Sequence, residues 1–79
     1  MSEPPIGVVE QVRIRRTAPP PALAKAIRQA AGLSQDALAK ELGVSRITVL
    51  RWESGERKPR GAAAVRYARL LAELKAVVG

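Results

Sequence analysis

Cysteine, histidine and phenylalanine are all missing from this sequence of 79 residues. Without cysteine, neither a disulfide nor a thiolate metal site can stabilise the fold, which must depend on packing or self-association. Without histidine, the commonest metal ligand and the commonest general base are both missing. The carboxylates of Glu41, Glu56 and Glu73 show no paired arrangement for acid–base catalysis. We therefore predict that the protein is not an enzyme and uses no metal or other cofactor.

Aromatic residues and long apolar runs are also scarce. Trp52 and Tyr67 are the only aromatic residues, which is too few for a platform that stacks the bases of RNA or single-stranded DNA. No apolar run approaches the roughly 20 residues of a membrane span, and the N-terminus lacks the apolar region of a signal peptide. We therefore expect a cytoplasmic protein of one domain, near the small end of what folds alone.

Positive charge is plentiful. Lysine and arginine number 14 against 7 aspartate and glutamate residues, which gives a formal net charge of +7. A surface with this excess of cations favours a polyanion such as nucleic acid as its partner.

Residues 35–54, QDALAKELGVSRITVLRWES, carry the clearest periodic pattern. Leu38 and Leu42 recur four residues apart, and Val49 and Trp52 recur three residues apart. Each half of the segment therefore has one apolar stripe at helical spacing. The pattern predicts two short amphipathic helices.

The connection between these helices is very short. Gly43 can take a left-handed backbone conformation without steric cost, so it can end the first helix. Ser45 offers a hydroxyl to the free amides at the start of the second helix. Ala39 is small where two steeply crossed helices approach closely. This order of residues is typical of a helix-turn-helix.

A longer set of residues carries a family resemblance. The set is Gly32-Leu33-Ser34-Gln35, Leu38-Ala39, Leu42-Gly43-Val44-Ser45, Thr48-Val49, Trp52-Glu53, Gly55, Arg57 and Pro59. With these residues the chain resembles the DNA-binding domain of Cro-like and lambda-repressor-like regulators, the XRE helix-turn-helix family. The resemblance covers about residues 22–75. It implies an all-α fold and binding to double-stranded DNA.

We accordingly expect a helix-turn-helix domain over residues 19–79 with four principal helices. The expected helices span residues 22–31, 35–42, 46–53 and 61–77, and Ser34 is the expected N-cap of the second. The residues expected to face inward in the first and last helices, or at the corner between the first two, are Leu23, Ile27, Ala30 or Ala31, Leu33, Val65, Ala68, Leu71 or Leu70, and Leu74.

Residues 1–18 form an N-terminal arm and linker ahead of this domain. Residues 6–16 are β-branched with partial alternation, which favours a short strand that pairs with its symmetry mate. A disordered arm is the alternative, and Arg13, Arg15 and Arg16 can also lie along DNA. The proline-rich stretch 17–21 predicts a stiff extended spacer.

The resemblance also implies which residues touch DNA. By position, base edges in the major groove would be contacted by Arg46, Ile47 and Arg51, and the backbone by Gln35, Ser45, Thr48, Arg57, Lys58 and Arg60. An arginine can donate two hydrogen bonds to one guanine, and an isoleucine can pack on a thymine methyl. Leu50 departs from the polar residues usual on that face. Arg28 and Glu53 match positions that form a structural ion pair in some relatives.

The function that follows is sequence-specific transcriptional regulation. We expect a small repressor that binds a palindromic operator as a homodimer, in the cytoplasm of a bacterial or phage-infected cell. An antitoxin is the alternative, because residues 58–74 resemble the end of antitoxins in that family. The arm would then bind a toxin protein by strand addition.

Overall fold

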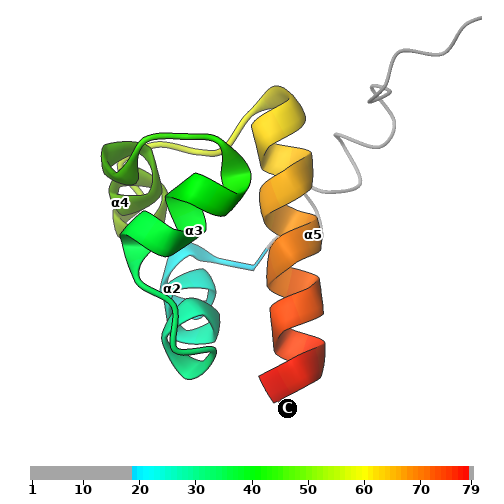
Figure 1. Cartoon of the computed structure of the whole chain (residues 1–79). Coiled ribbons are helices and arrows are strands. Elements are labelled where there is room, and N and C mark those ends of the chain that lie inside the picture. The colour runs from blue at the N-terminus through cyan, green and yellow to red at the C-terminus, as the bar shows by residue number, and fades with distance from the viewer. Residues whose placement is uncertain (1–18, 79) are drawn as a thin grey trace, which may run out of the picture.

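The computed structural model describes residues 19–78, which fold into four helices. These are α2 (Pro21–Ala30), α3 (Gln35–Leu42), α4 (Arg46–Ser54) and α5 (Gly61–Val78). In Figure 1 the three short helices lie together on one side, and the long α5 runs along their flank. The predicted all-α class is confirmed, and the described residues contain no strand.

The boundaries of α3 and α4 follow from their capping residues. The Ser34 hydroxyl accepts a hydrogen bond from the Ala37 amide at 3.0 Å, and the Ser45 hydroxyl accepts one from the Thr48 amide at 3.2 Å. Each serine thus satisfies an amide that the first helical turn leaves free. Between the helices Gly43 has a φ of 72°, the left-handed conformation that ends α3. The predicted helix-turn-helix is therefore present, with α3 at its predicted bounds.

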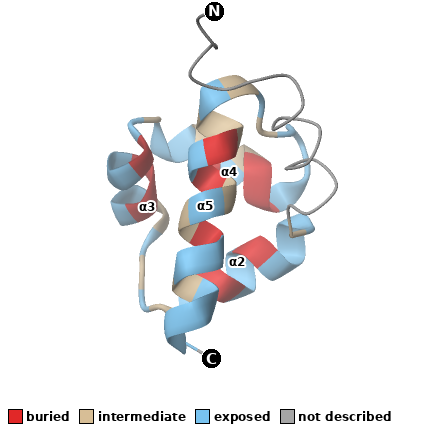
Figure 2. Cartoon of the chain, turned by 90° about the vertical axis from the view of Figure 1, so that its right-hand side faces the viewer, coloured by how far each residue is buried: buried red, intermediate tan, exposed pale blue. Residues whose placement is uncertain are grey.

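The core lies where the short helices meet α5. Leu38, Val49, Val65 and Leu71 are almost fully shielded from solvent. Figure 2 shows the buried residues as bands that recur along all four helices. Trp52 is buried as predicted, and its ring lies 4.7 Å from that of a second aromatic residue, centroid to centroid. That partner is Tyr67 of α5, so the two aromatic side chains of the chain join α4 to α5.

The predicted inward face of α2 is partly wrong. Leu23 is 43% exposed and Ala30 is also exposed, whereas Ala24 and Ile27 are buried as part of the core. The helix is rotated because Arg28 is buried as well, which turns the face of residues 24, 27 and 28 inward. A pattern of apolar residues alone does not reveal a buried arginine. Ala31 and Leu33 are only half-buried.

The inward face of α5 matches the prediction at its centre. Val65 and Leu71 are buried, while Leu70 and Leu74 are half-buried and pack against the core cluster. Ala68 is half-buried too. Tyr67, four residues before Leu71, is buried although it was not among the predicted core residues. It faces inward because the Trp52 ring lies against it.

Two sequence-based expectations concern other features of the chain. The N-terminal arm of residues 1–18, including the strand expected at residues 6–16, lies outside the described residues. Among the helices that the structure describes, none combines the length and the hydropathy needed to cross a membrane.

The burial of Trp52 predicts a large effect of its truncation. Trp52→Ala removes the largest side chain of the core, and such changes lower the free energy of unfolding by about 3–5 kcal/mol. Since a domain of this size has little more stability than that, we expect a molten or unfolded chain in thermal unfolding followed by circular dichroism. Ile47→Ala, at a position 51% exposed on the same helix, is the control and should melt like the wild type. A Trp52→Ala protein with wild-type helicity and melting would contradict this packing.

Candidate nucleic-acid interface

The outer face of α4 combines arginines with exposed apolar side chains. Arg46 is exposed, Ile47 and Leu50 are 51% and 40% exposed, and the Arg51 side chain is 41% exposed. Successive residues of a helix turn by about 100°, so these side chains project away from the buried inner face. The structure therefore brings together the three residues predicted to contact bases, Arg46, Ile47 and Arg51, on one exposed side of a short helix.

Ser45 and Thr48 cap the N-terminal end of α4. Besides accepting from the Thr48 amide, the Ser45 hydroxyl lies 2.8 Å from the Thr48 hydroxyl, at hydrogen-bond distance. Both side chains are therefore engaged with each other at the N-terminal end of α4. Free amides give this end of a helix a partial positive charge, which favours a nearby anion.

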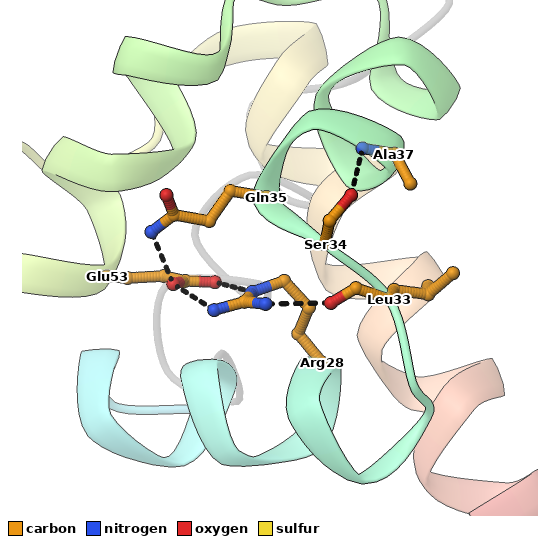
Figure 3. Close-up of polar contacts among 6 residues, drawn as sticks. All are labelled: Arg28, Leu33, Ser34, Gln35, Ala37 and Glu53. Atoms are coloured by element: carbon orange, nitrogen blue, oxygen red, sulfur yellow. Dashed lines mark hydrogen bonds and ion pairs between the residues drawn. The ribbon is translucent and has the colours of Figure 1, made fainter.

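A buried polar network fixes α4 relative to α2 and α3 (Figure 3). The guanidinium of Arg28 donates to both carboxylate oxygens of Glu53, from Nε at 2.6 Å and from Nη2 at 3.0 Å. Its Nη1 donates to the Leu33 carbonyl at 2.7 Å. The expected ion pair between Arg28 and Glu53 is therefore present, and it joins α2 to α4 and to the corner before α3.

Gln35 extends this network to α3. Its side-chain Nε2 donates to Glu53 Oε1 at 3.1 Å, a contact that was not predicted from the sequence. The spacing of 18 residues between the two partners gives no local signal for it. A carboxamide nitrogen carries a second N–H, so Gln35 retains a donor beyond this bond. The predicted phosphate contact of Gln35 stays a prediction.

The network changes the ionisation of its members. Burial raises the pKa of Glu53, but the hydrogen bonds from Arg28 and Gln35 and the positive charges of Arg28 and Lys25 together lower the pKa below its ordinary value. The hydrogen bond to Glu53 raises the pKa of Arg28, so both partners stay charged. Nearby, burial raises the pKa of Tyr67 to about 12, and its hydroxyl has no hydrogen-bond partner within the described residues.

The loop after α4 is basic and exposed. Arg57, Lys58 and Arg60 all point to solvent, and none forms an ion pair in the part of the chain that the structure describes. The loop stays close to α4 because the Arg57 amide donates to the Arg51 carbonyl at 3.2 Å. Cations that follow the exposed face of a helix in this way are suited to binding a phosphate backbone.

One acidic residue of this region, Glu56, was not among the residues predicted to contribute to the interface. Glu56 begins the loop, and its Oε2 lies 3.8 Å from Arg51 Nε. A weak signal for this contact is visible in the sequence, where Glu56 is the single acidic residue within the basic stretch 55–60. Within residues 19–78, no cluster of three or more acidic, histidine or cysteine side chains is arranged to hold a metal ion.

Comparison with known protein families gives one match. A family model described as Helix-turn-helix matches residues 25–74, which run from α2 into α5 and include the whole exposed face of α4. Comparisons with curated proteins and with solved structures gave no match.

The lowered pKa of Glu53 predicts acid sensitivity. A carboxylate with a lowered pKa stabilises the fold fully above the ordinary glutamate pKa of about 4.3, and this stabilisation is lost as the pH falls through the lowered value. We therefore expect the free energy of unfolding in urea to decline from about pH 5 towards pH 3. Glu73→Gln, which changes an exposed carboxylate, should keep this decline.

The decline should be smaller in Glu53→Gln. Because this variant breaks the buried pair and destabilises the fold, an NMR titration of the Glu53 carboxyl in the wild type gives an independent measurement. A Glu53 pKa at or above its ordinary value would contradict the network as described.

Proposed function

Because the chain belongs to the helix-turn-helix family of Cro-like and lambda-repressor-like regulators, we propose that it is a sequence-specific repressor of transcription. Family membership makes it a DNA-binding protein. The observation that best supports sequence-specific reading is the division of α4 into two faces. The inner face is fixed by Val49, Trp52 and Glu53, and the outer face presents arginine and isoleucine side chains to solvent.

In this proposal the outer face of α4 lies in the major groove. Arg46 and Arg51 are five residues apart, so they project about 140° from each other and differ in height by about 7.5 Å. Both can flank the line that faces the bases, with Ile47 between them. Each arginine would donate to guanine N7 and O6, and Ile47 would pack against a thymine methyl. Leu50, also exposed on this face, adds apolar surface next to Ile47.

The flanking polar groups would hold the DNA backbone. At the start of α3 and α4 lie Gln35, Ser45 and Thr48, close to free helix amides that favour an anion. Beyond the end of α4 lie Arg57, Lys58 and Arg60, whose charges are not neutralised within the described residues. Contacts of this kind position a protein on the duplex without reading its sequence.

We further propose a homodimer on a two-fold symmetric operator. One short helix reaches few base pairs, and a symmetric pair doubles the sequence that is read. Unpaired apolar surface is present at the end of α5, where Val77 is 82% and Val78 is 42% exposed. The N-terminal arm is the second candidate interface, but both it and the toxin contact of the antitoxin alternative lie outside the described residues. A repressor of this kind would act in the cytoplasm.

Selection of bound duplexes from a random pool tests the proposed function. We expect an enriched motif of two inverted half-sites whose centres lie about 10–10.5 base pairs apart, or a multiple of that. Each half-site should contain a guanine beside a thymine. A pool that shows no enriched motif after several rounds would contradict sequence-specific reading.

The roles of the loop cations can be separated from base reading by salt dependence. The logarithm of the binding constant should fall with the logarithm of salt concentration by about 0.9 for each phosphate neutralised. Arg57→Gln or Arg60→Gln should reduce this slope and leave the selected motif unchanged. Lys75→Gln, in the last turn of α5, is the matched control and should leave the slope as it is. A changed motif with an unaltered slope would contradict the assignment of these cations to the backbone.

A further inference from the structure

Glu56 is an acidic residue in a place where DNA binding alone would disfavour one. It lies between α4 and three exposed cations, in the stretch Gly55-Glu56-Arg57-Lys58-Pro59-Arg60. A carboxylate close to a phosphate backbone weakens binding to every DNA sequence alike. An effect of this carboxylate other than weaker DNA binding must therefore come from the contacts of Glu56. The structure shows one contact of the Glu56 carboxylate, to Nε of Arg51 at 3.8 Å.

Hydrogen bonds hold the backbone of Glu56 against the last turn of α4. Gly55 has a φ of 79°, a left-handed conformation that reverses the chain directly after the helix. The Ser54 hydroxyl donates to the Arg51 carbonyl at 3.1 Å and accepts from the Glu56 amide at 3.3 Å. The same hydroxyl therefore links the main chains of Arg51 and Glu56. These bonds hold the start of the Glu56 side chain at a fixed place beside Arg51.

The side of the guanidinium that Glu56 faces matters for base reading. A guanidinium has five N–H donors in a rigid plane, with one edge formed by Nε and one Nη and another edge formed by the two Nη atoms. Glu56 lies on the Nε side of Arg51. The edge formed by the two Nη atoms is left to donate in parallel to N7 and O6 of one guanine.

We propose that Glu56 is a positioning residue for base reading by Arg51. The carboxylate restricts the long Arg51 side chain, so less rotamer freedom is lost when the arginine meets its guanine. It also partly neutralises Arg51, which weakens the attraction of this side chain for phosphates of any sequence. Both effects raise the ratio of specific to non-specific binding. This inference rests on the proposed function, since it requires that Arg51 reads a base.

The test is a double-mutant cycle with the full chain. Binding of the wild type, Glu56→Gln, Arg51→Ala and the double variant is measured on the selected operator and on a scrambled duplex at one salt concentration. Glu56→Gln should bind the scrambled duplex more tightly than the wild type does. Its operator-to-scrambled ratio should fall about fivefold, at the lower end of the contribution of one bidentate arginine–guanine contact. In the Arg51→Ala background, Glu56→Gln should leave the ratio unchanged.

A purely electrostatic role of Glu56 makes a different prediction, because loss of its charge would strengthen binding to both duplexes equally. Suppose that the wild type prefers the operator to the scrambled duplex and that Glu56→Gln has the same operator-to-scrambled ratio. This result would overturn the inference and leave the proposed function standing. A wild type that binds the operator and the scrambled duplex equally well would overturn both the inference and the proposed function.

Glu73→Gln is the control, because it removes the same charge from the exposed surface of α5 and should keep the wild-type ratio. Repeating the random-pool selection with Glu56→Gln should relax the preference at one guanine of each half-site.

Discussion

The structure depends above all on the buried ion pair between Arg28 and Glu53. Burial removes both charges from water, and such a pair is tolerated only when hydrogen bonds replace the lost solvation. Here Arg28 donates to both carboxylate oxygens and to the Leu33 carbonyl, and Glu53 also accepts from Gln35. These bonds tie α2, α3 and α4 together. Loss of one partner would leave an unpaired buried charge, which lowers stability by about 3–5 kcal/mol.

This network links stability directly to the proposed recognition of DNA. Glu53 and Trp52 fix the rotation of α4 about its axis, and that rotation decides that Arg46, Ile47 and Arg51 face outward. A reading helix must be held rigidly, because a small displacement removes the geometry of a bidentate contact. The end of α4 is held in place in a similar way, because the Ser54 hydroxyl bonds the main chains of Arg51 and Glu56.

Local features of the fold could be predicted from the sequence. The serine caps, Gly43 and the apolar stripe of α3 act within a few residues, and the structure has them as predicted. Among the long-range features, the ion pair between Arg28 and Glu53 was expected from the family resemblance alone. The apolar pattern gave the wrong face of α2 because burial of Arg28 depends on a carboxylate 25 residues away, and burial of Tyr67 depends on the Trp52 ring. The residues proposed to contact bases came from the family resemblance, whereas the contact of Gln35 with Glu53 and that of Glu56 with Arg51 required the three-dimensional structure. The contacts with DNA themselves stay predictions.

The central claim is that the outer face of α4 reads bases, and Arg51→Lys tests it most directly. Lysine keeps the charge but lacks the planar fork of the guanidinium. Binding of this variant to the selected operator and to a scrambled duplex is measured at one salt concentration. If Arg51 reads a base, binding to the operator weakens by about 1–3 kcal/mol, while binding to the scrambled duplex is nearly unchanged. Equal losses on both duplexes would make Arg51 a phosphate contact and would contradict the account.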